Sequence, residues 1–454
     1  MGRISLATVD VPLTGFAGIV GEERVSTDPA ARTLYAIDGM MPSLVVYART
    51  EEEVAAVLKF AAERNLAVIP CRNATKLGIG NRPRRYDIAL SVKEMNQVWH
   101  YEPADLTVSV EPGIKLGDFE HFLSRQSLWI PLDPPGGAKS SLGGIVATNA
   151  AGPLRLRYGA PRDMVLGLKV ATTEGKVIKT GGRVVKNVAG YDLAKLITGS
   201  YGTLGVIVEI SLKLFPLPGR RATWVLRTSS LDVARDFRRR ILDSPLSPMR
   251  MVLLDAGAAS LSRGDLELHQ GDELEIWVEF GGSERVIQRC LETVRDLARA
   301  AGASEEVLDD LSATRGWDLI SDFGSTRLED SPQSVTVKAA LPIDSGEEFL
   351  QFTHNQCEKH ALRAASFIQN GVGVAHICLV PKDSSPVSSA FIQELRERAI
   401  SLGGSLILER SPLEIKKEMD VWGPVGDDFM VMQKLKKLWD PKGILSPGRF
   451  VGGL

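Results

Sequence analysis

The sequence predicts an α+β protein that contains more than one domain. Strand-like apolar runs are followed by amphipathic helical segments along most of the chain. Pro216 and Pro218 end one strand, and beyond Arg220 the spacing of turns and helices changes, which marks a domain boundary. A length of 454 residues agrees with roughly two to three domains.

A β-α-β unit is predicted after an irregular start over residues 1–40. Residues 43–48 form a buried strand, and Thr50 begins a capping box with Glu53. The apolar residues that follow recur at helical spacing and lead into a strand at 67–70.

More strands are predicted before the boundary. The strand 106–110 is turned by Pro112-Gly113 into a helix. Glu174-Gly175 forms the turn of a β-hairpin, and residues 206–214 alternate strictly between apolar and other positions.

The second region, from Arg220 onward, alternates strands with helices. The arginine run 238–240 is expected to form a solvent-exposed helix face. Residues 303–333 are polar and poorly periodic, so we expect a surface excursion there. Strands are expected at 224–226, 251–254, 275–280, 335–339, 376–380 and 405–408, and helices near 231–242, 284–301, 346–361 and 387–401.

Composition excludes several classes of protein. The net charge of −2 gives no electrostatic reason to expect nucleic-acid binding. No apolar stretch approaches the roughly 18–20 residues of a membrane span, and the first residues resemble no signal peptide, so we expect a cytoplasmic protein. No cysteine pair has C-x-x-C spacing, so we expect no metal site and no disulfide framework. The cysteines are Cys71, Cys290, Cys357 and Cys378.

Glycine is concentrated between Leu132 and Pro216. Such loops let backbone N–H groups approach a ligand closely and form concave anion sites. The ligand implied is large and phosphorylated. The glycines at 199, 202 and 205 precede a strand and not a helix, which disfavours a Rossmann site. The motifs of this run are Asp133-Pro134-Pro135, Ser141-Leu142-Gly143-Gly144, Arg157-Tyr158-Gly159, the segment 185–192 and Gly199-Ser200-Tyr201-Gly202-Thr203-Leu204-Gly205.

These motifs resemble the PCMH-type FAD-binding domain of the vanillyl-alcohol-oxidase superfamily. Within it, the chain is most similar to the small FAD-binding subunits of bacterial glycolate oxidases. A second match lies at Trp439–Phe450. The resemblance implies an FAD-binding domain at 1–218, an α+β cap domain at 219–434, and a tail at 435–454 that returns to the FAD domain.

The resemblance also implies cofactor contacts, and the first FAD loop departs from the family pattern. The family sequence Pro-x-Gly-Gly-Gly-Thr-Lys-Leu-Gly is here 70–78, with Arg72, Asn73 and Ala74 in place of three glycines. Arg72 could pair with a phosphate, or the three side chains could obstruct the site. The implied cofactor residues are Arg72, Asn73, Ala74, Thr75, Lys76, Asp133, Pro134, Ser141, Leu142, Gly143, Gly144, Asn149, Gly152, Tyr158, Gly202, Thr203, Gly205 and Ile207.

We expect the FAD to be non-covalent. Covalent attachment in this superfamily uses a His or a Cys, and the first loop contains no His. Cys71 lies in that loop, and we interpret it as a core or loop thiol.

The substrate side is less clearly marked. A 2-hydroxy acid needs a cation for its carboxylate and a base for its hydroxyl proton. Lys338, His376 and Arg410 of the cap are the candidates, although His376 also fits a buried strand histidine.

The resemblance implies an FAD-dependent subunit of a glycolate-oxidase-like complex that oxidises a 2-hydroxy acid. The implied partners are a larger catalytic flavin subunit and an iron–sulfur subunit, through which the chain could associate with a membrane. Two alternatives stay open at this point. One is a self-sufficient FAD-linked oxidase of another hydroxy acid or alcohol, and the other is a flavin-free, non-catalytic scaffold subunit.

Overall fold

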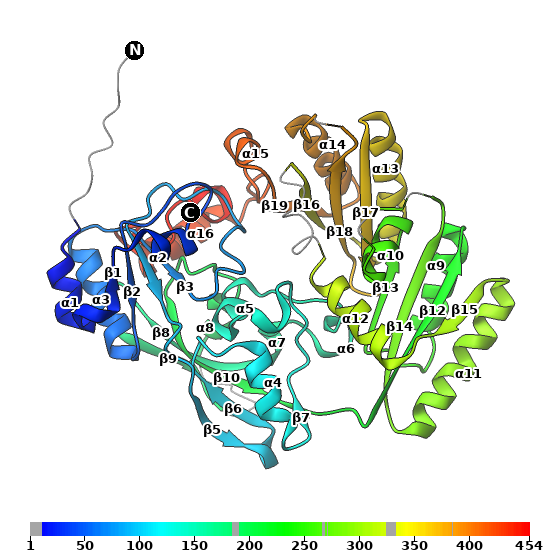
Figure 1. The fold of residues 1–454 in the computed structure, drawn as a ribbon, viewed down its shortest axis with the longest axis horizontal. Helices are drawn as coiled ribbons and strands as arrows, with labels where there is room; N and C mark the ends of the chain where they lie inside the picture. Colours follow the sequence, from blue (N-terminus) through cyan, green and yellow to red (C-terminus); the bar gives the residue numbers. More distant parts are fainter. Residues whose placement is uncertain (1–10, 184–189, 266–267, 270, 324–332, 384) are drawn as a thin grey trace.

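A computed structural model describes residues 11–183, 190–265, 268–269, 271–323, 333–383 and 385–454. Residues 185–189 of the fourth glycine-run motif therefore lie outside the described residues. Figure 1 shows an N-terminal part with several small sheets beside a C-terminal part built on one large sheet. The chain is an α+β protein, as the sequence predicts.

The N-terminal part contains a mixed four-stranded sheet and an antiparallel five-stranded sheet. Their strand orders are β1-β2-β4-β3 and β5-β6-β10-β8-β9, and β7 pairs separately with β11. The elements are α1 Leu13–Val20, β1 Val25–Ser26, α2 Pro29–Leu34, β2 Leu44–Tyr47, α3 Glu51–Glu63, β3 Val68–Cys71, β4 Ile88–Ser91, β5 Val98–Glu102, β6 Thr107–Val110, α4 Leu116–Ser124, β7 Leu128–Trp129, α5 Leu142–Thr148, α6 Arg155–Tyr158, α7 Pro161–Met164, β8 Val165–Ala171, β9 Val177–Gly181, α8 Leu193–Ile197, β10 Val206–Lys213 and β11 Phe215–Pro216.

Local sequence signals explain these elements. The Thr50 side chain accepts from the Glu53 N–H at 3.2 Å and caps α3, which is one half of the predicted capping box. The other half does not form, because the Glu53 carboxylate accepts from the Arg49 N–H at 2.8 Å. The hairpin β8–β9 turns at Gly175, which has a φ of 79°. The expectation of an irregular start is wrong for the described residues 11–40, because α1 and α2 form there. Phe16 of α1 is fully buried and packs edge-on against Phe60 of α3, at 4.8 Å between ring centroids.

The C-terminal part is built on an antiparallel eight-stranded sheet, here called the cap sheet, in the order β15-β12-β14-β13-β17-β18-β16-β19. Helices α9, α11, α13 and α14 pack on one face, and α10 and α12 pack on the other. The elements are β12 Arg220–Thr228, α9 Leu231–Leu242, β13 Arg250–Leu254, α10 Ala256–Arg263, β14 Leu274–Gly282, α11 Glu284–Ala301, β15 Ser304–Val307, α12 Asp310–Ser321, β16 Val335–Ala340, α13 Gly346–Lys359, β17 Leu362–Gln369, β18 Val374–Pro381, α14 Ser389–Ser401, β19 Ser405–Arg410, α15 Leu413–Glu418 and α16 Phe429–Trp439.

Two expectations about the C-terminal part are wrong. The described residues 303–323 are not a plain surface excursion, because they contain β15 and α12, and Trp317 of α12 is 1% exposed. The arginine run in α9 is not wholly solvent-exposed either. Arg238 is 2% exposed, and its Nε donates to the buried Glu347 at 2.8 Å.

The chain end lies on the N-terminal part. After α16, the Val68 N–H of β3 donates to Ile444 O at 2.8 Å, and the Ser446 N–H donates to Val68 O at 2.9 Å. The edge strand β19 of the cap sheet lies on the side of that sheet that faces the chain end and the N-terminal part (Figure 1).

Candidate functional site

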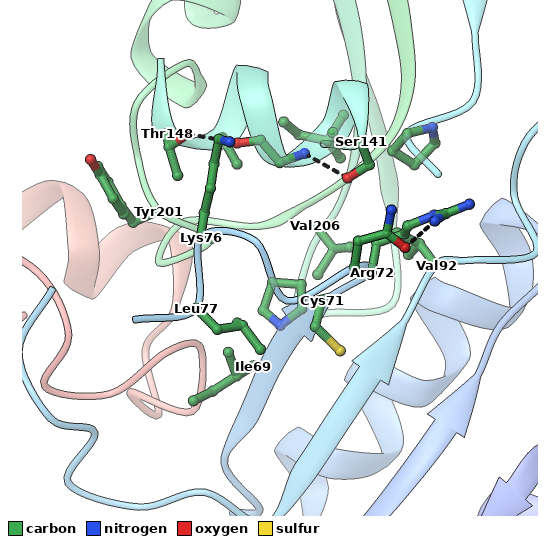
Figure 2. A pocket seen from close by; sticks show the side chains of 18 of the residues that line it. Ile69, Cys71, Arg72, Lys76, Leu77, Val92, Ser141, Thr148, Tyr201 and Val206 are labelled. Carbon is green, nitrogen blue, oxygen red and sulfur yellow. Dashed lines mark hydrogen bonds between the residues drawn. The ribbon is translucent and has the colours of Figure 1, made fainter. Parts of the chain in front are cut away.

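A cavity lies in the N-terminal part among β3 and the loop after it, the start of α5 and the turn before β10 (Figure 2). The empty space within it, counted together with solvent at its open mouth, is about 840 Å³. The sequence-predicted cofactor residues that line it are Arg72, Asn73, Ala74, Thr75, Lys76, Ser141, Gly143, Gly144, Gly202, Gly205 and Ile207.

The other predicted cofactor residues lie outside this lining, and several have structural partners. The Asp133 carboxylate accepts from the Leu154 N–H at 3.0 Å and lies 3.6 Å from Arg250 of the cap sheet. Burial raises the pKa of Asp133 to about 7. Tyr158 packs edge-on against Trp129, at 5.4 Å between ring centroids. The residues outside the lining are Asp133, Pro134, Leu142, Asn149, Gly152, Tyr158 and Thr203.

The loop after β3 presents free backbone N–H groups. Among the described residues, the N–H groups of Asn73, Ala74, Thr75 and Lys76 have no hydrogen-bond partner. Ala74 has a φ of 61°, so this position keeps the left-handed conformation that usually favours glycine. Consecutive free N–H groups around such a residue form an anion-binding nest. The nest therefore persists although three glycines are replaced.

The side chains of this loop are held by neighbouring segments. Arg72 Nε donates to Gly113 O at 2.8 Å, a second Arg72 nitrogen donates to Asn73 Oδ1, and Asn73 Nδ2 donates to Lys139 O. Lys76 Nζ donates to Pro135 O at 2.7 Å. Burial lowers the pKa of Lys76 to about 8. These contacts fix the loop, and they engage Nε and one terminal nitrogen of Arg72 with protein acceptors.

The two glycines at the start of α5 have different surroundings. An added Cβ at Gly143 would lie 2.9 Å from Pro112 O, whereas at Gly144 it would meet only Ser141 Oγ, at 3.2 Å. The Gly143 N–H donates to Pro112 O at 2.8 Å. Gly143 is thus required by packing, and Gly144 leaves open space on the cavity side.

The candidate substrate residues come together on the cap sheet. Lys338 of β16 is the register partner of His376 of β18, and Thr336 is opposite Arg410 of β19. His376 is 4% exposed. Sequence reasoning missed Glu409, which lies between His376 and Lys338. Its carboxylate lies 3.1 Å from His376 Nδ1 and 3.7 Å from Lys338 Nζ.

A β-bulge explains why Glu409 joins this group. The β16–β19 register shifts between Thr336 and Val337, so that Glu409 and Arg410 together occupy one position of the ladder. Bulges of this kind redirect side chains, often beside active sites. Burial alone would raise the pKa of Glu409, but His376 and Lys338 outweigh it and hold that pKa at about 2. An ionised carboxylate only accepts, so His376 Nδ1 donates to it.

Three further residues of this region were not predicted as site residues. Gln369 Nε2 lies 3.3 Å from His376 Nε2, on the side opposite Glu409. Tyr201 and Arg449 line the cavity. Tyr201 has a φ of 55°, and a non-glycine residue in this region often marks a functional site. Tyr201 lies in the motif at 199–205 and Arg449 in the motif at Trp439–Phe450, so the sequence singled out both segments. Neither motif indicates where the side chain points.

No group of three or more His, Cys, Asp and Glu side chains in the described ranges could hold a metal ion. None of the helices in the described part of the chain is both long enough and apolar enough to cross a membrane.

Comparison with protein families gives two matches that together span most of the chain. Residues 42–181 match the family of FAD binding domains, and residues 217–450 match the C-terminal domain of FAD linked oxidases. The second match covers more than half of the sequence.

Individual relatives agree over nearly their whole length. A glycolate oxidase subunit of Bacillus subtilis is 27% identical over 95% of this chain and 94% of its own. A probable mitochondrial D-lactate dehydrogenase of Danio rerio is 28% identical over 98% of this chain and 92% of its own.

A solved structure shares the fold. p-Cresol methylhydroxylase with bound substrate superposes with a TM-score of 0.76 at 19% identity, over 96% of this chain and 95% of its own. The two family matches confirm the predicted FAD-binding flavoprotein and its FAD cofactor, and the chain belongs to the FAD-linked oxidases.

Proposed function

We propose that this oxidoreductase oxidises a 2-hydroxy acid, with FAD held non-covalently in the cavity described above. The names of two relatives, a glycolate oxidase subunit and a probable D-lactate dehydrogenase, support this substrate class. When bound, FAD supplies a two-electron acceptor for the substrate carbon that carries the hydroxyl group.

The residues of the first loop fit the diphosphate of FAD. The free N–H groups of residues 73–76 form an anion nest, and the open side of Gly144 leaves room for a ligand. In this proposal Gly202, Gly205 and Ile207 line the remaining length of the cofactor. Burial strongly raises the pKa of Cys71, which favours the inert thiol and a non-covalent cofactor.

The cap residues fit proton transfer and carboxylate binding. In the neutral form of His376, Nδ1–H donates to ionised Glu409, and Nε2 is the atom proposed to accept the substrate hydroxyl proton. Gln369 Nε2 lies 3.3 Å from that nitrogen in this structure, so the substrate hydroxyl would replace this amide contact. Lys338 and Arg410 are the proposed cations for the substrate carboxylate. The single observation that carries this proposal is the His376–Glu409 contact beside Lys338, near the β19 edge of the cap sheet, which faces the N-terminal part (Figure 1).

We also propose that the chain works as a subunit of a glycolate-oxidase-like complex, in the cytoplasm or at a membrane through its partners. A larger catalytic flavin subunit and an iron–sulfur subunit are the proposed partners. The printed name of the Bacillus subtilis relative, a subunit, supports this part of the proposal.

Anaerobic mixing of the FAD-loaded chain with glycolate or D-lactate tests the function. We expect the flavin absorbance to bleach, and Glu409→Gln and His376→Gln to slow bleaching by about 100-fold with the resting flavin spectrum unchanged. Arg363→Gln, on the same sheet outside this cluster, is the control. Bound FAD that neither acid reduces would contradict the proposal and favour the alternative in which the chain oxidises another hydroxy acid or an alcohol.

A further inference from the structure

Arg449 brings a buried guanidinium to the cavity from the far end of the chain. It belongs to the segment after α16 that lies on β3, it lines the cavity, and it is 4% exposed. Its backbone is fixed, because Arg449 O accepts from Trp422 Nε1 at 2.9 Å and from the Asn81 N–H at 3.1 Å. The backbone contacts therefore hold the residue that carries this guanidinium in place beside the cavity.

Only part of this guanidinium is satisfied by the protein. Arg449 Nη2 donates to Leu77 O at 2.6 Å and also to Ile79 O. Arg449 Nη1 is buried and has no hydrogen-bond partner among the described residues. Buried donors are nearly always paired, and a charged donor is especially costly to leave unpaired.

Arg449 also lacks a counter-ion within the described part of the chain. The carboxylate of Asp38 is already paired with Lys416 Nζ at 3.0 Å. Burial lowers the pKa of Arg449, and Asp38, Tyr86 and Tyr201 only partly offset this. The site thus has a buried cation and a free donor, and both call for an anionic oxygen from a ligand.

We propose that Arg449 Nη1 donates to a diphosphate oxygen of FAD, and that Arg449 supplies the cofactor's principal cation. This inference depends on the proposed placement of FAD in the cavity. Arg449 Nη2 binds the carbonyl of Leu77, one residue after the free N–H groups at 73–76, so the cation and the nest flank the same space. Arg72 was the cation expected from sequence, but its Nε is engaged by Gly113 O.

The competing explanation is that Arg449 only tethers the first loop. Lys416 provides a matched control, because it is also a buried cation bonded to this loop. Its Nζ donates to Gly78 O at 2.7 Å, yet Lys416 does not line the cavity. A pure tether predicts equal effects from both residues, whereas a phosphate contact predicts a larger effect from Arg449.

Dissociation constants of FAD and of ADP test this, measured by flavin fluorescence quenching and by ADP competition at low and high salt. Arg449→Met should weaken both ligands by about tenfold or more, with a reduced salt dependence, and Lys416→Met by less than about threefold. Arg449→Lys keeps a donor for the loop carbonyls and guards against a folding defect. It should fall between wild type and Arg449→Met.

Three results would overturn the inference. They are wild-type affinity in Arg449→Met, equal losses in Arg449→Met and Lys416→Met, or a loss for FAD without a loss for ADP, which would put the contact on the flavin. Failure of wild-type protein to bind FAD at all would instead contradict the proposed function, so the two failures are distinguishable.

Discussion

The two glycines that begin α5 should respond to substitution in opposite ways. A Cβ at Gly143 would lie 2.6 Å from Pro112 Cβ and 2.9 Å from Pro112 O, so Gly143→Ala must displace backbone. We expect it to lower the free energy of unfolding by about 1–3 kcal/mol. Among the described residues outside the backbone of α5, a Cβ at Gly144 would meet only Ser141 Oγ, at 3.2 Å. Alanine favours a helix, so Gly144→Ala should keep or raise stability by up to about 1 kcal/mol.

Cofactor binding should show the reverse order. Gly144→Val extends a branched side chain into the cavity and should raise the FAD dissociation constant at least tenfold, or about 1.4 kcal/mol. The folded fraction of Gly143→Ala should bind FAD as wild type does. Thermal unfolding of the FAD-free variants and FAD titration measure the two effects separately. Wild-type FAD affinity in Gly144→Val would refute the placement of the cofactor beside α5.

Three other perturbations follow from single contacts. Ala74 has a φ of 61°, so Ala74→Gly should raise the free energy of unfolding by up to about 1 kcal/mol in thermal unfolding, and a loss would contradict the strain. Burial holds the Lys76 pKa at about 8, and a bound diphosphate favours the charged form of Lys76. FAD affinity should therefore fall as pH rises above 8, and Lys76→Met should remove this pH dependence of FAD affinity. Arg238→Ala leaves Glu347 buried without its partner and should cost about 3–5 kcal/mol in urea unfolding, against less than about 0.5 kcal/mol for exposed Arg239→Ala; similar losses would refute the buried pair.

Signals that act within a few residues were predictable from sequence. Thr50 caps α3 and Gly175 turns the β8–β9 hairpin, because a side chain or a φ angle decides the local conformation. The glycine motifs at 141–144 and 199–205 contribute residues to the cavity lining, whereas the motifs at 133–135 and 157–159 do not. Such features depend on the backbone within one or two turns, and distant residues do not change them.

Features that depend on distant partners were missed. Trp317 of α12 is buried because Trp277 and Thr223 of the cap sheet contact it, and a polar surrounding sequence hides that packing. Arg238 can be buried because its Nε donates to Glu347, which lies more than 100 residues away in sequence. No local pattern reports either pairing.

The candidate site shows the same limit. Glu409 reaches His376 through a bulge that one extra residue creates in β19, and strand periodicity alone puts adjacent residues on opposite faces. Arg449 reaches the cavity because the chain end lies on β3. The motif that contains Arg449 therefore could not predict that its Nη1 would be buried without a partner among the described residues.

The most direct test of the account is the flavin content of the purified chain before and after acid precipitation. We predict one FAD per chain, released into the supernatant, because the cavity offers an anion nest and Cys71 is an inert buried thiol. Flavin that stays with the precipitated protein would contradict non-covalent binding and implicate Cys71. A chain that neither carries FAD nor takes it up on reconstitution would contradict the central claim.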